Sequence, residues 1–177
     1  MRGAALVIVA AAVAGCAAIG SSERSRVPAA SAAATLEPTK GNATAGTVSF
    51  AQRGDRVVVT VDISGLKPNA EHGFHVHEKG DCSSGDGMSA GGHFNPAGKS
   101  HGPYAGAERH AGDMPNLKSD GSGRASATFE VTGMAIGQGN SDIVGKGLIV
   151  HRDADDYKSQ PAGNAGPRLA CAVIRRA

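Results

Sequence analysis

The chain has no tryptophan, and aromatic residues make up only 3% of its 177 residues. It also has no excess of charge of either sign, since its formal net charge is +2. No stripe of lysine and arginine runs along it, and such a stripe is the usual footprint of a nucleic-acid-binding surface. We therefore expect no nucleic-acid partner, and any useful electrostatic field has to be local.

No apolar run is long enough to span a bilayer. Residues 6–14 form a short apolar run that follows the positively charged Arg2 and leads into Val13-Ala14-Gly15-Cys16. This order is typical of a signal peptide, and the small-small-Cys ending resembles the lipobox of bacterial lipoproteins, which are cleaved before the cysteine and acylated on its thiol. We expect a signal peptide over residues 1–15 and a lipid on Cys16, so that the only membrane contact is this anchor. An ordinary signal peptide with a chance cysteine is the alternative.

Cysteine is scarce as well, with Cys16, Cys82 and Cys171 as the only three. A lipidated Cys16 leaves the other two in an exported protein, where oxidising conditions let disulfides persist. The expected location is the periplasm or cell envelope.

Glycine, by contrast, is abundant, with 26 residues, and a helical bundle rarely tolerates that much. Residues 17–39 are rich in Ala and Ser and show no apolar periodicity, which is typical of a flexible tether. A poorly recognised first strand in the last few of these residues is the alternative. The expected division is therefore a signal peptide at 1–15, a lipidated N-terminus and tether at 16–40, and one folded domain at 41–177.

Short β-rich segments separated by turns run through that domain. Alternation over residues 56–64 is the clearest, and Arg53-Gly54-Asp55 before it is a hairpin signal after a strand at 44–51. Further strands are expected at 73–77, 124–132, 147–151 and 169–175. A long segment, residues 80–115, is rich in glycine and has neither helical nor strand period, and such a segment is usually functional or disordered. A second loop is expected at residues 152–168. The predicted fold class is an all-β sandwich or barrel without a convincing helix.

Histidine is the residue that carries chemistry here, because six of the seven lie between residues 72 and 110. In Gly73-Phe74-His75-Val76-His77, the side chains two apart share one side of a strand. His75 and His77 can therefore hold one metal ion together, while Phe74 and Val76 face the core. His72 has the opposite parity and is expected not to be a ligand.

The first long loop adds His93, His101, His110 and Asp113, three imidazoles and a carboxylate that suit tetrahedral zinc. His151 ends a later strand and completes a second set with His75 and His77. With His93 shared, that set has four imidazoles, which suits Cu(II). Spacing alone leaves two independent zinc sites or a di-metal hydrolase open, although no Walker A or H-E-x-x-H motif occurs.

Four segments resemble the copper–zinc superoxide dismutase family in order and approximate spacing. They are Gly73-Phe74-His75-Val76-His77-Glu78, Gly92-His93-Phe94-Asn95-Pro96, Glu108-Arg109-His110-Ala111-Gly112-Asp113 and Gly163-Asn164-Ala165-Gly166-Pro167-Arg168-Leu169-Ala170-Cys171. The resemblance covers roughly residues 44–175. It implies a flattened eight-stranded Greek-key β-barrel with two long functional loops, and an oxidoreductase that converts superoxide to dioxygen and hydrogen peroxide.

Carried over residue by residue, the resemblance implies one copper and one zinc per subunit. Copper would be held by His75, His77, His93 and His151, and zinc by His93, His101, His110 and Asp113. It further implies that His93 bridges the metals, that Arg168 lies beside copper, and that Cys82 and Cys171 form a disulfide. Asp155 matches the carboxylate that hydrogen-bonds one copper ligand and one zinc ligand.

Other functions remain as alternatives to a dismutase that protects against superoxide outside the cytoplasm. A non-catalytic copper-binding or copper-delivery module with this fold would typically lack metal ligands or the arginine, and all of them are present here. The complete zinc set argues against a copper-only dismutase. The interval from His151 to Arg168 looks short against the animal-type pattern and fits the bacterial branch. A homodimer is expected over a monomer.

Overall fold

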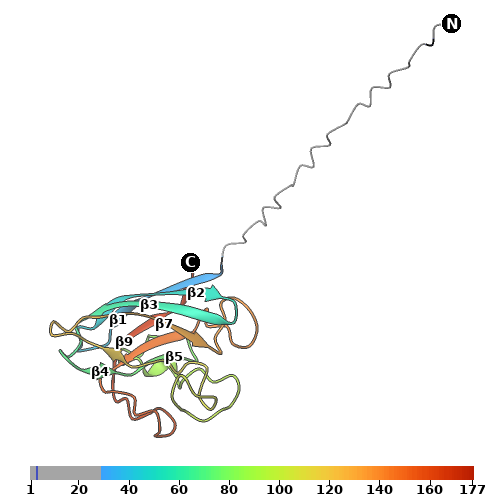
Figure 1. Ribbon diagram of the computed structural model, residues 1–177. Coiled ribbons are helices and arrows are strands. Elements are labelled where there is room, and N and C mark those ends of the chain that lie inside the picture. The colour runs from blue at the N-terminus through green and yellow to red at the C-terminus, as the bar shows by residue number, and fades with distance from the viewer. Residues whose placement is uncertain (1–2, 4–28) are drawn as a thin grey trace.

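The fold is described from a computed structural model, which places Gly3 and residues 29–177 (Figure 1). The predicted signal peptide, Cys16 and the first part of the predicted tether lie outside these described residues. Within the described part of the chain, no helix is long and apolar enough to cross a membrane.

Strands account for nearly all of the regular structure. The one helical element is a 3-10 turn, η1 at Met88–Ala90, among the residues that the structure places. The strands are β1 Ser31–Pro38, β2 Ala45–Arg53, β3 Arg56–Ser64, β4 Glu71–His72, β5 Phe74–His77, β6 Leu117–Lys118, β7 Ala125–Thr132, β8 Gly147–His151, β9 Arg168–Val173 and β10 Arg175–Arg176.

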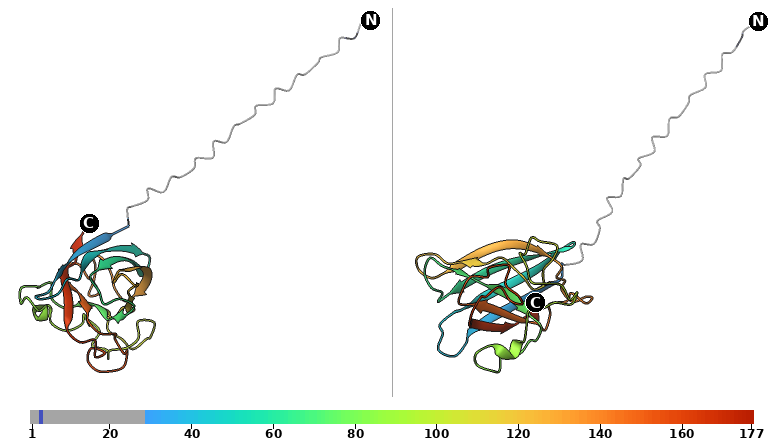
Figure 2. Two further views of the ribbon diagram at one scale, coloured as in Figure 1. Left: turned by 90° about the vertical axis from the view of Figure 1, so that its left-hand side faces the viewer. Right: turned by 90° about the horizontal axis from the view of Figure 1, so that it is seen from below.

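The main sheet has eight strands, all paired antiparallel. Its order is β5-β8-β9-β1-β2-β3-β7, with β10 also paired to β1. The sheet curls around a common interior (Figure 2), and β4 and β6 form a separate two-stranded ribbon. Because β1 lies between β2 and β9, strands from the two ends of the domain are neighbours. The prediction of an all-β Greek-key architecture is confirmed.

The predicted tether is wrong over its last third, where β1 lies. Ala32, Ala34 and Leu36 of this strand are buried, and the strand pairs with β2 along one edge and with β10 and β9 along the other. The alternative of a first strand in this segment is therefore the correct one. Alternating small apolar side chains fit the interior of a curled sheet, and the backbone hydrogen bonds to two neighbours hold the strand there.

The core occupies the inside of the curled sheet. On β3 the side chains alternate as predicted, and Val57, Val59, Val61 and Ile63 are all buried. The hairpin to β2 turns at Gly54-Asp55, and Gly54 has a φ of 61°, which two-residue hairpin turns require. The predicted last strand is interrupted at Ile174, whose N–H donates to Lys146 O, so that β9 and β10 are separate.

Two long segments, residues 78–116 and 152–167, project from the same side of the sheet (Figure 1). They cover the outward face of β5 and β8, which explains why every residue of these two strands is buried. Isolated bridges join His75 to Asp113 and His77 to His93, so the first long segment runs beside β5. Both segments thus lie where the predicted metal ligands are.

Candidate metal centre

Strand β5 provides the first two ligands of the candidate centre. Phe74 and Val76 belong to the core, and His75 and His77 point the other way, toward the long segments. His151, at the end of the neighbouring strand β8, and His93 of the first long segment complete the group. One ring nitrogen from each of these four buried histidines lies within 4.8 Å of all the others.

Each imidazole has two ring nitrogens, and the hydrogen bond that one of them makes shows that the other is free to bind a metal. His77 Nδ1 donates to Gly91 O at 2.9 Å, and His151 Nδ1 donates to Gly166 O at 3.1 Å. His75 Nε2 donates to a carboxylate oxygen of Asp155 at 2.9 Å. Carbonyl and carboxylate oxygens only accept, so they fix the proton on these nitrogens. The remaining nitrogens are Nε2 of His77 and His151 and Nδ1 of His75.

The second group is built around the carboxylate of Asp113. Asp113 Oδ1 lies 2.8 Å from His93 Nδ1 and 3.4 Å from His110 Nδ1, and Oδ2 lies 3.1 Å from His101 Nδ1. Backbone N–H groups of His110 and Gly102 donate to Oδ2 and orient the carboxylate. All four side chains are buried and their ligand atoms lie within 4.8 Å of one another.

His93 belongs to both groups. Its Nδ1 faces Asp113, and its ring stacks on that of His75 with the centroids 4.0 Å apart. Since the two nitrogens of one imidazole point in opposite directions, a deprotonated His93 can join one metal to the other. The structure therefore brings together all seven predicted ligands in two groups that share one ring.

Buried ring nitrogens without a partner show that these groups fit metal ions. Among the described residues, the buried side-chain nitrogens with no hydrogen bond include His75 Nδ1, His93 Nε2, His101 Nδ1 and His110 Nδ1. Buried polar atoms are normally satisfied, and four orphans directed into two clusters are what an ion at each cluster would satisfy. The fifth orphan is Nε2 of His72, whose Nδ1 contacts His151 O at 2.9 Å. His72 belongs to neither of the two groups.

Asp155 joins the two groups from outside. Its Oδ2 accepts from His75 Nε2 and its Oδ1 accepts from His101 Nε2, both at 2.9 Å, and the residue is buried. Asn116 holds the backbone of Asp155 through two hydrogen bonds of 2.9 Å, one in each direction. The predicted carboxylate link between one residue of each set is therefore present.

Burial and these hydrogen bonds set the protonation of the centre. Burial lowers the pKa of His93 to about 4 and of His151 to about 3, and it lowers the pKa of His77 well below its usual value. These three imidazoles are therefore neutral at pH 7, as metal ligands must be. Burial also acts to lower the pKa of His101, but the neighbouring carboxylates of Asp113 and Asp155 outweigh it and raise that pKa to about 9.

The two carboxyl groups respond in the opposite sense. Burial acts to raise the pKa of Asp113, but the neighbouring imidazoles of His101, His110 and His93 hold it well below its usual range. The pKa of Asp155 is likewise lowered, because hydrogen bonds from His101 and His75 outweigh burial. Both groups are ionised at neutral pH and supply the negative charge that a cluster of cations needs.

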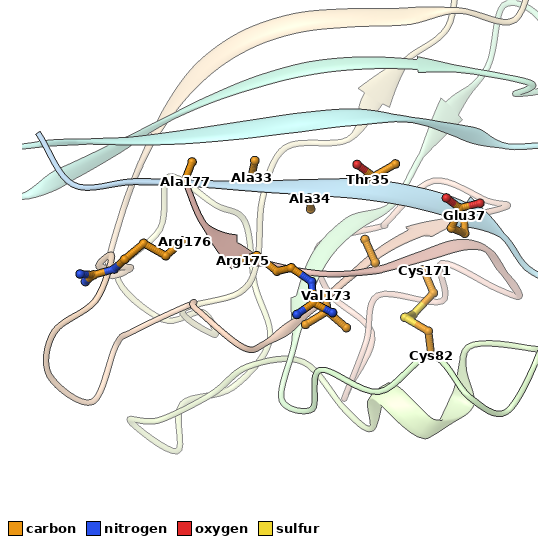
Figure 3. A pocket seen from close by; sticks show the side chains of 11 residues that line it. Ala33, Ala34, Thr35, Glu37, Cys82, Cys171, Val173, Arg175, Arg176 and Ala177 are labelled. Carbon is orange, nitrogen blue, oxygen red and sulfur yellow. A yellow bond between two sulfur atoms is a disulfide. The ribbon is translucent and has the colours of Figure 1, made fainter.

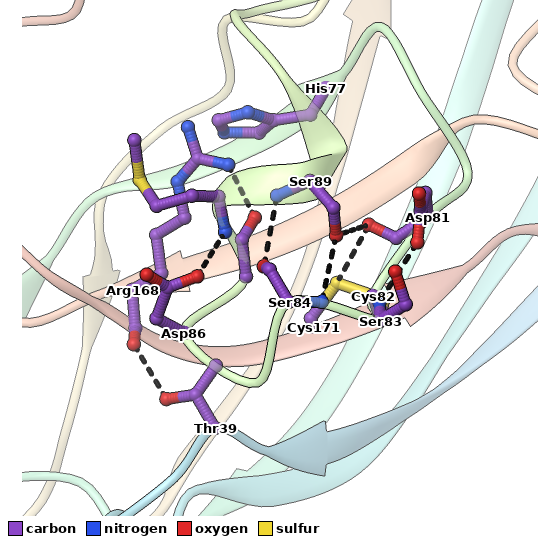
Figure 4. The surroundings of a disulfide bond; sticks show 12 residues. Thr39, His77, Asp81, Cys82, Ser83, Ser84, Asp86, Ser89, Arg168 and Cys171 are labelled. Atoms are coloured by element: carbon purple, nitrogen blue, oxygen red, sulfur yellow. Dashed lines mark hydrogen bonds between the residues drawn. A yellow bond between two sulfur atoms is a disulfide. The ribbon is translucent and has the colours of Figure 1, made fainter.

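Arg168, at the start of β9, lies beside His77 (Figure 4). Its two terminal nitrogens donate to the carbonyls of Gly87 and Gly91, and Gly91 O also accepts from His77. The guanidinium is thus fixed relative to a predicted copper ligand while the residue stays partly exposed. Burial lowers its pKa, yet a guanidinium remains charged at neutral pH.

The disulfide between Cys82 and Cys171 is present, as predicted. It closes a separation of 89 positions and joins the first long segment to β9 (Figure 4). Asp81, Ser84 and Ser89 are linked by hydrogen bonds next to it. The disulfide therefore holds the stretch of chain that supplies Gly87 and Gly91 to Arg168.

One hydrolase pattern is present in the chain but is not a hydrolase site. Gly87-Met88-Ser89-Ala90-Gly91 has the G-x-S-x-G form, which places a serine nucleophile on a sharp turn between a strand and a helix. Here the pattern covers the 3-10 turn η1, and Ser89 Oγ donates to Asp81 O at 2.8 Å. Within the described residues, no histidine is hydrogen-bonded to this hydroxyl.

Three residues of the site carry no signal that sequence reasoning detected. Asn116 holds Asp155, Gln160 holds the backbone of His101, and buried Arg109 donates to His110 O and Thr132 O. Their contacts join positions that are distant in the sequence, apart from the one to His110. A polar residue in a loop carries no period or motif that announces such a contact.

A hollow of about 480 Å³ lies beside the disulfide between Cys82 and Cys171 (Figure 3). Residues of β1, β9 and β10 line it together with the disulfide, and it contains none of the predicted metal ligands. Its walls are mainly apolar, so it offers no chemistry comparable to that of the histidine groups.

Comparison with known proteins shows which family this chain is similar to. The family described as copper/zinc superoxide dismutase matches residues 44–174. The copper–zinc superoxide dismutase of Paramecium bursaria Chlorella virus 1 is 44% identical over 151 residues, which cover 81% of this chain and 77% of the relative. That of Saccharomyces cerevisiae is 42% identical over 144 residues, covering 76% and 92%.

A bacterial relative and a solved structure are also similar to this chain. A second copper–zinc superoxide dismutase of Aquifex aeolicus is 41% identical over 134 residues, which cover 73% of this chain and 78% of the relative. A crystal structure of the clock protein EA4 aligns with a TM-score of 0.75 at 37% identity, covering 84% of this chain and 96% of that one.

Proposed function

This chain belongs to the copper/zinc superoxide dismutase family, and from that premise we propose that it is an exported dismutase whose redox-active copper is joined to zinc through His93. It is an oxidoreductase that uses copper and zinc. The reaction converts two superoxide anions and two protons to one dioxygen and one hydrogen peroxide. The observation that carries the detailed proposal is the pair of buried histidine groups that share one ring.

His75, His77, His93 and His151 would hold copper, and His93, His101, His110 and Asp113 would hold zinc. Copper supplies the one-electron redox change, and zinc, which has no accessible redox change, supplies charge and rigidity. The free atoms identified above assign His75 Nδ1 and the Nε2 atoms of His77, His93 and His151 to the copper side. The Nδ1 atoms of His93, His101 and His110 belong to the zinc side.

His93 has the additional role of handling a proton. Its Nε2 takes up a proton in one half of the cycle and gives it back in the other, when peroxide needs two protons. Its Nδ1 lies beside Asp113, so the ring would keep its position whether or not Nε2 carries a proton. This role needs a ring that is neutral or anionic rather than cationic at pH 7, and burial supports that by lowering the pKa of His93 to about 4.

Arg168 binds the incoming anion. Two backbone carbonyls hold its guanidinium beside His77, and charge-assisted hydrogen bonds from a fixed guanidinium suit a small oxygen anion. The same charge raises the rate of encounter with superoxide. Arg168 and His93 are therefore the proposed catalytic residues, and Asp155 orients His75 and His101.

The biological part of the proposal rests on the export signal that the sequence predicts. Residues 1–15 would be removed as a signal peptide, and Cys16 would carry the lipid that keeps the domain at the cell envelope or in the periplasm. The disulfide agrees with an oxidising compartment. The folded domain would start near residue 30 rather than 41, because β1 belongs to it. The enzyme would protect against superoxide formed outside the cytoplasm.

Cell fractionation with a Cys16→Ala variant tests the anchor. The wild-type protein should be recovered with membranes and should incorporate a labelled fatty acid, and the variant should do neither. Survival of a deletion strain under external superoxide tests protection, and unchanged survival contradicts it. A homodimer is also expected, and sedimentation equilibrium of the purified protein measures it.

The experiment that tests the chemistry compares the purified full chain, loaded with copper and zinc, with its His151→Ala variant. Fast superoxide dismutation that the variant loses supports the redox-active copper site. A wild-type protein that binds both metals without turnover would instead indicate a copper-binding or copper-delivery module.

A further inference from the structure

Gln160 contacts a predicted zinc ligand through an unusual pair of hydrogen bonds. The N–H of His101 donates to Gln160 Oε1 at 2.9 Å, and Gln160 Nε2 donates to His101 O at 2.9 Å. The carboxamide therefore satisfies both backbone groups of His101 at once, as a neighbouring β-strand would. The two residues are 59 positions apart and lie on different long segments.

His101 differs from the other predicted zinc ligands in how its backbone is held. His93 and Asp113 form isolated β-bridges to β5, and His110 O accepts from Asp113 N and from buried Arg109. His101 belongs to no strand or bridge, and within the described part of the chain its backbone hydrogen bonds are both with Gln160. Without that side chain, none of the residues that the structure places would hydrogen-bond the backbone of this ligand.

The segment that carries Gln160 also holds the ring of His101. Asp155 accepts from His101 Nε2, and the chain passes so close that a Cβ on Gly163 would lie 2.7 Å from the same nitrogen. Gln160 fixes the backbone and Asp155 fixes the far nitrogen. His101 is therefore held from both sides by one segment, and its Nδ1 is left facing Asp113 at 3.1 Å.

This segment has internal bonds that keep Gln160 in place. Asp156 Oδ1 accepts from the N–H groups of Lys158 and Ser159 at 2.9 and 2.8 Å, and Gly163 N–H donates to Ser159 O at 2.7 Å. A side chain that extends from an ordered turn loses less conformational entropy when it binds. Gln160 can thus act on His101 although it is itself exposed.

We propose that Gln160 is a positioning residue of the zinc site: by holding the backbone of His101 it sets how long zinc is retained. The inference rests on the proposed assignment of His101 to zinc. Outer contacts of metal ligands commonly change metal affinity by about 10–100-fold. The effect is confined to zinc, because among the described residues the side chain of Gln160 contacts no histidine of the copper group.

The test uses the full chain loaded with copper and zinc, with Gln160→Ala, Gln160→Glu and Lys158→Ala variants. Lys158 is the matched control, because it lies on the same segment and contributes only backbone atoms to the hydrogen bonds of the described residues. Zinc and copper release into a chelator are followed separately. Cobalt(II) placed in the zinc site reports the ligand geometry through its visible absorption.

We expect zinc release from Gln160→Ala to be about 10-fold faster than from wild type, with copper release unchanged and the cobalt bands altered. Gln160→Glu keeps the acceptor for His101 N–H and loses the donor, so its zinc release should be intermediate. Lys158→Ala should match wild type.

The inference is overturned if Gln160→Ala releases zinc at the same rate as the wild-type protein. If that variant then unfolds more easily without metal, Gln160 stabilises the fold and not the zinc site. Equal acceleration of copper release also overturns the inference. A wild-type protein that holds no zinc at all refutes the zinc assignment in the proposed function, and this inference with it.

Discussion

Replacing Asp155 by Asn tests whether one carboxylate fixes a ligand in each metal group. The carboxylate accepts from His75 Nε2 and His101 Nε2, each at 2.9 Å, and from Tyr157 N–H at 2.7 Å. Asparagine has the same shape but only one acceptor oxygen and an NH₂ that donates. It can serve one of the two rings and must present a donor to the other.

The ring that faces the amide nitrogen must then change its tautomer or turn away. If that ring is His75, its proton moves to Nδ1, the atom proposed to bind copper, and if it is His101 the proton moves to the proposed zinc atom. Loss of a hydrogen bond that orients a metal ligand commonly weakens metal affinity by about 10–100-fold, which corresponds to about 1.4–2.8 kcal/mol of binding free energy. We expect Asp155→Asn to lose that much affinity for at least one of the two metals.

Competition with a chelator measures both affinities, and Asp153→Asn is the matched control. The side chain of Asp153 lies on the same long segment, and its hydrogen bonds go to Arg152 rather than to a histidine. Circular dichroism of the metal-free proteins checks that both variants fold. If Asp155→Asn binds copper and zinc as tightly as the control, Asp155 does not set the tautomers and the reasoning is refuted.

Three further predictions concern the anion site, the first strand and the disulfide. Arg168→Ala should retain both metals but lower kcat/KM for superoxide by about 10-fold or more, and kcat/KM should depend less on salt than in the wild type. Pulse radiolysis measures this rate, and an unchanged kcat/KM would show that Arg168 does not take part in catalysis. Leu36→Ala should lower the free energy of unfolding of the metal-free protein by about 2–5 kcal/mol in denaturant titrations. Thr35 is exposed, so Thr35→Ala should change this free energy little, and equal effects of the two variants would contradict the place of β1 in the core. Cys82→Ser should cost roughly 4–5 kcal/mol by the chain-entropy estimate for an 89-position separation, and a value near zero would show that the long segment is held without the bond to Cys171.

Periodicity predicted those parts of the fold where burial alternates clearly. On β3 the branched residues Val57, Val59, Val61 and Ile63 occupy every second position, and this pattern requires one buried face. β1 has the same alternation but builds it largely from alanine. Alanine is common in tethers and weak as a strand signal, so only pairing with β2, β9 and β10 shows that this segment is a strand.

The ligand set could also be predicted from the sequence. Two histidines separated by one residue in a strand share a face because the strand period is two, and that geometry is local. Ligand chemistry suggested two sets, and the family resemblance chose copper and zinc over two zinc sites or a di-metal hydrolase. The structure brings the ligand atoms of each set within 4.8 Å of one another.

Only the tertiary structure decided what surrounds the ligands. Which ring nitrogen is free depends on Gly91 O, Gly166 O and Asp155, and these acceptors come from segments that only the folded chain brings into contact. The contact of Gln160 with His101 spans 59 positions and follows no repeat. Local periodicity and spacing, together with the family resemblance, determined which residues could bind metal, while the direction and retention of each ligand depend on long-range contacts that no local pattern encodes.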